Sequence, residues 1–473
     1  MTSSILTLHN RYLLCFALMA LLFGLAINQS IYPVALYSLI LAVLFIILLS
    51  LYRFSIQLEP LHFVILLMLS SLVFKVFAVL IFEYLMLDTV GIPFLSYKDD
   101  YVYNEAATKI VGVWNTRGFG FYRDISFSTG FYSGYPNFSA LAKLAFGDSH
   151  LVPRFLNVLF STLTIPFYFA TIRYLTDKDA LTKLASILLA FSPAFVVYSA
   201  LQLKDTILIF FVASLIYGTV NFFAKGINTK NILLVAFSMG ALLFFRAAIL
   251  LPYLVAIFLC TVLVRKNQSS SFTSVLWVGL VVLCFYLIWE YLYSSGLLSL
   301  TGEEYFNSRM EQRGQAEAYQ GSNDLGKLGV IALLLGPILA VFSLFLPTPT
   351  YMELDPGMNT VAYHYLPLLG YYAILPMVTV SLLYLLKNYR AHKIGLFIIG
   401  FLILYKLGQA GGKSILDSRQ SLPAIYAAYL LLAYFDGQKP DIALLWERYH
   451  LIITLVLLTV MFSVTFLRYV VRM

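Results

Sequence analysis

Apolar runs long enough to cross a bilayer recur along the chain, separated by shorter polar segments. About 20 apolar residues in helical form span the roughly 30 Å of hydrocarbon in a membrane. The runs do not alternate between polar and apolar residues as transmembrane β-strands do, and a backbone in lipid must satisfy its own hydrogen bonds. About 13 spanning helices are predicted, at residues 12–28, 32–51, 62–87, 152–174, 181–199, 205–223, 231–245, 247–264, 274–292, 365–386, 394–407, 422–435 and 451–467.

One further apolar segment, residues 329–346, is interpreted as re-entrant or interfacial. A full span there would put the basic segment 387–393 on the same side as the long polar loop that follows Tyr293. The rule that basic loops stay inside opposes that placement. The basic residues near the carboxyl terminus favour the other choice, so the sequence leaves this segment open.

Composition agrees with an all-α polytopic membrane protein. Hydrophobic residues make up 61% of the chain and charged residues 11%, with a mean hydropathy of +0.85. A soluble domain has too little core to cover that much apolar surface. The formal charge of +8 is spread over short basic patches beside hydrophobic segments, which indicates a role in topology and no nucleic-acid partner. The bilayer is therefore the first predicted partner.

The same pattern sets the predicted organisation. With the amino terminus inside and retained as a first helix, the polar segments collect on the outer face. The predicted units are residues 1–87 with the first helices, 88–151 as the first outer loop, 152–293 as a transmembrane core, 294–327 as an outer polar loop and 328–473 with the last helices. The polar loop 294–327 is interpreted as a lid over a cleft or as a solvated helix.

The first outer loop contains a predicted amphipathic helix. Apolar residues recur every three or four positions, at Tyr103, Ala107, Ile110, Val111 and Trp114. This spacing is typical of an interfacial helix.

Two carboxylates, Asp99 and Asp100, stand where this helix begins, and Gly118 stands where it ends. A simple cap with a dipole-compensating acid is the alternative to a functional acidic pair.

The segment "DDYVYNEAA" is similar to the acidic-pair-then-tyrosine signature of GT-C glycosyltransferases. The chain most resembles the protein O-mannosyltransferases and the lipid A aminoarabinose transferase of family 39. The resemblance continues through the landmarks Gly-Tyr-Pro, Arg-Phe-Leu-Asn, Ser-Pro and Leu-Lys-Asp, and it covers residues 97–253. Each landmark alone is weak, but their order and spacing are more specific.

The resemblance implies a GT-C-like bundle that transfers a sugar from a polyprenyl-phosphate or diphosphate carrier. The acceptor would be a lipid-linked glycan or another envelope molecule, at the outer face of the bacterial inner membrane. Asp99 would act as the general base, with Asp100 as the second catalytic carboxylate. A hydroxyl that attacks an anomeric carbon must lose its proton, and a carboxylate within hydrogen-bond reach accepts it.

Four basic residues near predicted outer helix ends are candidates for binding the carrier phosphate: Arg154, Lys204, Arg246 and Arg419. Snorkelling to the membrane surface is the alternative for each of them. Asp205, Tyr103 and Glu105 are candidates for binding the acceptor or supporting the site. In the third predicted span, Lys75 and Glu83 are about two turns apart, which predicts that each pairs with another helix.

The cofactor is left open. Some family members use a divalent metal, for which His150 or His364 with an outer carboxylate is a candidate, but no metal-binding motif supports this. The three cysteines, Cys15, Cys260 and Cys284, lie in apolar runs and are assigned no function.

Two other functions are compatible with the sequence. A polysaccharide polymerase or ligase that uses undecaprenyl-diphosphate-linked repeats would depend on Arg246 and Arg419 more than on Asp99. A flippase or transporter of lipid-linked sugars would place charges along a central pathway through many helices.

Overall fold

The computed structural model describes ten segments of the chain, and all their regular structure is helical: residues 57–94, 99–120, 134–226, 228–264, 366–389, 391–410, 419–436, 441–448, 451–452 and 456. The predicted helices at 12–28, 32–51 and 274–292, most of 451–467, and the segment 329–346 lie outside these residues. The predicted total of about 13 spans therefore stays a prediction.

Six helices form the amino-terminal half of the described bundle: α3 (Pro60–Val90), α6 (Leu151–Leu175), α7 (Asp179–Ala190), α8 (Pro193–Ala200), α9 (Asp205–Lys225) and α10 (Thr229–Arg246). The remaining helices of the bundle are α11 (Leu250–Val264), α16 (Leu366–Lys387), α17 (Lys393–Ala410), α18 (Leu422–Leu431) and the 3-10 turn η6 (Leu432–Tyr434). Five segments of the described residues are long and apolar enough to cross a membrane. They agree with the predicted multi-pass architecture.

The predicted helix 181–199 is divided in two. α7 ends at Ala190 and α8 begins at Pro193, with Phe191 and Ser192 between them. Proline has no backbone N–H to donate to the preceding turn, and the first turn of a helix is the position where this costs least. Gly370 of α16 lies directly against Pro193, where a Cβ would have no room.

Arg246 separates α10 from α11, as the two predicted spans 231–245 and 247–264 require. Its φ of −166° and ψ of 84° leave the helical region, and the short 3-10 turn η2 (Ala247–Ile249) follows. α10 packs on α9, whereas α11 packs on α17. The two helices thus form a hairpin with Arg246 at its turn.

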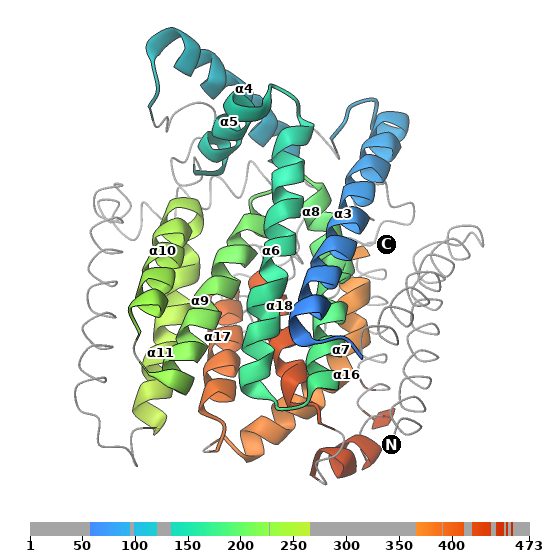
Figure 1. Ribbon diagram of the computed structural model, residues 1–473, viewed down its shortest axis with the longest axis vertical. Coiled ribbons are helices and arrows are strands. Elements are labelled where there is room, and N and C mark those ends of the chain that lie inside the picture. The colour runs from blue at the N-terminus through green and yellow to red at the C-terminus, as the bar shows by residue number, and fades with distance from the viewer. Residues whose placement is uncertain are drawn as a thin grey trace, which may run out of the picture.

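Two helices outside the bundle, α4 (Asp99–Arg117) and α5 (Gly134–Phe146), lie across one end of it (Figure 1). We call this the α4 end. The predicted amphipathic helix is confirmed: Tyr103, Ala107, Ile110 and Trp114 are buried on one face, and Val111 is half-buried beside them. Gly118 ends α4 with a φ of 89°.

The sequence does not predict α5, which packs against α4. The buried ammonium of Lys143 in α5 donates to Thr108 of α4 at 2.7 Å and to Asp148 at 3.0 Å. These contacts fix the second helix under the first.

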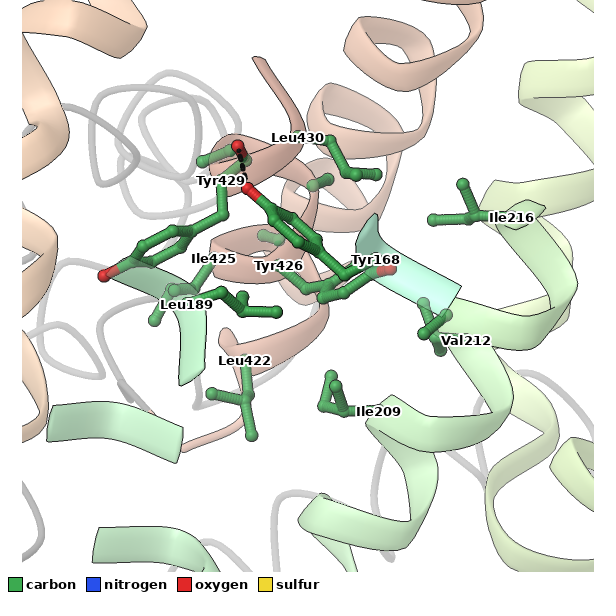
Figure 2. Packing of buried hydrophobic residues seen from close by; sticks show 14 of the residues in the cluster. Tyr168, Leu189, Ile209, Val212, Ile216, Leu422, Ile425, Tyr426, Tyr429 and Leu430 are labelled. Atoms are coloured by element: carbon green, nitrogen blue, oxygen red, sulfur yellow. Dashed lines mark hydrogen bonds between the residues drawn. The ribbon is translucent and has the colours of Figure 1, made fainter. Parts of the chain in front are cut away.

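The main core of the bundle is built from aromatic and aliphatic side chains, and α6, α7, α9 and α18 meet near its centre. Figure 2 shows Tyr168 of α6 beside Tyr426 and Tyr429 of α18, and the Tyr168 hydroxyl donates to the Tyr429 carbonyl at 2.6 Å. The rings of Tyr168 and Tyr426 meet edge to face, with centroids 5.7 Å apart. A buried tyrosine hydroxyl usually finds such a partner.

Lys75 and Glu83 of α3 each contact α6 or the residue before it, as predicted. The Lys75 ammonium donates to the Ser161 hydroxyl at 2.7 Å, and Glu83 Oε1 lies 2.9 Å from His150 Nε2. The buried thiol of Cys260 donates to the Lys393 carbonyl, which ties α11 to the start of α17.

Candidate active site

Four chain segments converge at the α4 end and bring charged side chains together. They are the amino terminus of α4, the loop 201–204 before α9, the hairpin turn at Arg246, and the turn before α18. The segments are separated by up to several hundred residues in sequence. Their proximity is therefore a product of the tertiary fold.

Arg419 connects the two carboxylates of this cluster. Its Nη1 lies 2.6 Å from Asp99 Oδ2, and its Nε lies 3.6 Å from Asp205 Oδ2. The first distance is that of a charge-assisted hydrogen bond, whereas the second is an ion pair without one. Asp205 is 5% exposed and Asp99 is 45% exposed, so the first carboxylate is enclosed and the second is open to solvent.

Arg246 is the second arginine that contacts Asp205. Its Nη1 lies 3.8 Å from Asp205 Oδ1, and its Nη2 donates to Gln420 Oε1 at 3.0 Å. Gln420 is next to Arg419 in the chain, so both guanidinium groups are held by the same turn. Gln420 cannot be predicted from the sequence, because a glutamine beside a helix start carries no distinctive signal.

Local structure explains why the charges stand where they do. Asp99 and Asp205 are the first residues of α4 and α9, where the helix dipole favours negative charge. Arg246 is the last residue of α10, where the dipole favours positive charge. Each terminus thus stabilises the sign of the charge that it carries.

Lys204 lies among these four charges, in the loop that leads into α9. Burial lowers the pKa of its ammonium to about 7, and the nearby Arg246 and Arg419 act in the same direction. Asp205 and Asp99 oppose the shift without cancelling it. Two carboxylates and two guanidinium groups balance in charge, so a protonated Lys204 leaves the cluster with one net positive charge.

Tyr103 lies beside the charged cluster, near Asp99, Arg419 and Asp205. It is buried one turn after Asp99, and its ring meets that of Tyr135 in α5 edge to face, with centroids 5.1 Å apart. Burial raises the pKa of both hydroxyls, and the Asp99 carboxylate raises that of Tyr103 further. Tyr135 accepts a hydrogen bond from Asn157 of α6 at 3.1 Å.

The other predicted residues occupy different places at the α4 end. Asp100 is fully buried, and its Oδ1 accepts from the Tyr101 N–H at 3.0 Å. Glu105 is exposed and forms an ion pair with Lys109 at 3.2 Å. Arg154 is fully buried below the segment that leads into α4, where it donates to the Pro93 carbonyl and covers the ring of Phe94. Their roles in catalysis or phosphate binding stay predictions.

Two residues of α17 hold the turn that carries Arg419. Lys406 is buried and donates to the Ser421 hydroxyl at 2.7 Å, while the Tyr405 hydroxyl donates to the Gln420 carbonyl at 2.8 Å. Neither residue is among the predicted site residues. A lysine inside an otherwise apolar run is a signal that identifies such a position.

Metal binding receives no support from the part of the chain that the structure describes. Within those residues, no three His, Cys, Asp or Glu side chains group as metal ligands. His150 Nε2 pairs with Glu83 of α3, whereas His364 and the loop 294–327 lie outside the described residues.

The arrangement offers an anion-binding group of three basic side chains beside an exposed carboxylate. Comparison with known proteins finds one family for part of the chain. Residues 135–289 match the family of dolichyl-phosphate-mannose-protein mannosyltransferases. The matched segment contains Lys204, Asp205 and Arg246, and it lies between Asp99 and Arg419 in sequence. No curated protein matches the chain significantly.

Proposed function

We propose that this membrane glycosyltransferase of the dolichyl-phosphate-mannose-protein mannosyltransferase family, which uses a lipid-linked donor, serves bacterial envelope synthesis. In this proposal a sugar passes from a polyprenyl-phosphate or diphosphate carrier to a lipid-linked glycan or other envelope acceptor. The α4 end faces outward from the inner membrane, on a GT-C-like bundle of about 13 helices. The observation that carries the proposal is the contact of Arg419 with both Asp99 and Asp205.

The basic side chains account for the donor half of the reaction. As the bond between the anomeric carbon and the phosphate oxygen breaks, negative charge grows on the carrier phosphate. Lys204, Arg246 and Arg419 converge from three segments, and positioned cations stabilise that charge. Asp205, enclosed between the two guanidinium groups, keeps them at a fixed separation when no phosphate is bound.

Asp99 accounts for the acceptor half. The acceptor hydroxyl oxygen forms a bond to the anomeric carbon, and the carrier phosphate leaves with the electrons of the broken bond. The hydroxyl proton passes to the Asp99 carboxylate, which is the exposed carboxylate of the cluster. Tyr103, one turn further along α4, bounds the space beside it.

Arg419 links the two halves. In the structure its Nη1 lies 2.6 Å from Asp99 Oδ2, so this oxygen already accepts a hydrogen bond before substrate binds. A carrier phosphate beside Lys204 and Arg246 competes for the same guanidinium. Donor binding then draws Arg419 from Asp99 and leaves the carboxylate to the acceptor hydroxyl.

The decisive experiment replaces the proposed base. We expect Asp99→Asn to lower the rate of sugar transfer by about 10²-fold or more, the contribution typical of a general base, with donor binding retained. Transfer is measured with purified protein and a polyprenyl-phosphate-linked sugar. Asp88→Asn, which changes an exposed carboxylate in the last turn of α3 at the same end, is the matched control and stays active.

The same assay separates the alternatives. Full transfer by Asp99→Asn, with altered glycan chain length in Arg246→Met and Arg419→Met, would contradict a base at Asp99 and indicate a polymerase or ligase. Movement of a lipid-linked sugar across liposomes without any transfer would indicate a transporter.

A further inference from the structure

The loop 201–204 carries Lys204 and leads into Asp205, yet it is buried. Leu201, Gln202 and Leu203 have no exposed surface, and one internal bond, from the Leu203 N–H to the Leu201 carbonyl at 2.9 Å, shapes the loop. A buried loop outside regular secondary structure needs side-chain partners for its backbone groups. The side chains that hydrogen-bond to this loop therefore determine the position of Lys204.

Asn157 of α6 supplies two of these partners. Its Nδ2 donates to the Leu201 carbonyl at 2.7 Å and to the Leu203 carbonyl at 2.9 Å, and the residue is fully buried. The same nitrogen lies 3.1 Å from the Tyr135 hydroxyl in α5. An amide nitrogen has two hydrogens, so these three acceptors share them.

Through Tyr135 the contact reaches the other half of the site. The Tyr135 ring packs on Tyr103, which is one turn from Asp99 in α4. A single amide group thus joins the loop that carries the phosphate-binding lysine to the helix that carries the base.

We infer that Asn157 is a positioning residue: it holds Lys204 and Asp205 close to Asp99 and does not itself touch substrate. This inference rests on the proposed function. Donation to both carbonyls requires an N–H group, so a carboxylate or an aliphatic side chain leaves the carbonyls without this donor. Buried carbonyls that lose their donor favour a displaced loop. Small displacements of a binding group are costly for reactions that depend on orientation.

The test is a double-mutant cycle read in the KM for the donor. We expect Asn157→Leu to raise this KM by about 10-fold while kcat changes less than about threefold, the size of effect seen for coupled neighbours. In a Lys204→Met background the same substitution should raise KM less than about twofold, because the group that it positions is absent. Asn157→Asp, which keeps the shape and lacks the donor, repeats the test if Asn157→Leu does not fold.

Thr162→Val on the same helix is the matched control. Thr162 is buried, and its hydroxyl donates to the Val158 carbonyl of its own helix, so the donor KM should not change. The inference would be overturned if Asn157→Leu raised the donor KM equally in both backgrounds, or if Thr162→Val raised it as much as Asn157→Leu does. Failure of the proposed base is seen separately, as full activity of Asp99→Asn, because that test reads the rate of transfer and this one reads donor affinity.

Discussion

At the residue scale, the site depends on one guanidinium that serves two carboxylates. Arg419 is 18% exposed and reaches Asp99 and Asp205 from the turn before α18. Its planar fork presents several donors at fixed angles, which suits simultaneous contact with two anions and, in turn, with a phosphate. A lysine at this position has one compact charge and cannot bridge both carboxylates in the same way.

Lys204 gives the site a predicted pH dependence. Its pKa of about 7 means that the charged form declines as the pH rises above neutrality. If this charge binds the carrier phosphate, the donor KM should rise by up to about tenfold per pH unit above pH 7. Below that pH the ammonium is protonated and KM should level off.

Lys204→Arg is the control for this prediction, measured as donor KM from pH 6 to 9. Arginine stays charged over the whole range, so the variant should lose the dependence. A wild-type KM that stays constant to pH 9 would show that the charge of Lys204 does not contribute to donor binding.

At the element scale, α5 sets the position of the hairpin turn. Its first residue, Gly134, lies so close to α10 that a Cβ there would overlap the Phe244 carbonyl oxygen. Phe244 is two residues before Arg246. The Gly-Tyr-Pro landmark therefore has a structural explanation: the glycine permits this approach, Tyr135 reaches Asn157, and the proline lies in the first turn of α5.

Gly134→Ala should displace the end of α10 and, with it, Arg246. We expect a loss of about 1–3 kcal/mol in the free energy of unfolding, as for other overpacked sites, together with weaker donor binding. Thermal unfolding in detergent and the donor KM measure the two effects.

Gly112→Ala in α4 is the matched control, because nothing lies within 4 Å of a Cβ there. This variant should be neutral or more stable by about 0.5–1 kcal/mol, since alanine favours the helix. Equal destabilisation by both substitutions would contradict the packing explanation.

At the scale of the whole molecule, the ion pairs of Asp99, Arg419, Asp205 and Arg246 connect the start of α4 to the hairpin turn. α4 lies across this end of the bundle (Figure 1). Lys183 lies beyond the other end of α6, near the start of α7, where it pairs with Asp179 at 2.6 Å and donates to the Leu58 carbonyl. In the proposed function, the α4 end faces outward and this other end faces the cytosol.

A membrane-impermeant thiol reagent tests this orientation in intact cells. With Cys15, Cys260 and Cys284 replaced by alanine, Thr116→Cys at the exposed end of α4 should be labelled from outside. Lys178→Cys, exposed between α6 and α7, should be labelled only after permeabilisation. The reverse pattern would place Asp99 in the cytosol and exclude the proposed reaction.

The described helices show how much of the fold the pattern of apolar residues predicts. The starts and ends of α3, α6 and α9 lie within a few residues of the predicted spans, because a run of apolar residues in lipid has no alternative to a helix. The amphipathic face of α4 was equally predictable from its spacing. The break at Pro193 and the existence of α5 were not predicted: short helices between longer elements produce weak periodicity.

The sequence by itself determined that the chain is a helical membrane protein, and it determined which residues carry charge where helices begin and end, since these depend on composition and local spacing. Only the tertiary structure decided that Arg419 meets Asp99 and Asp205, that Gln420 holds Arg246, and that Asn157 holds the loop before α9. These contacts join residues far apart in the chain, and pairing at such separation depends on how whole helices pack. No local pattern encodes it.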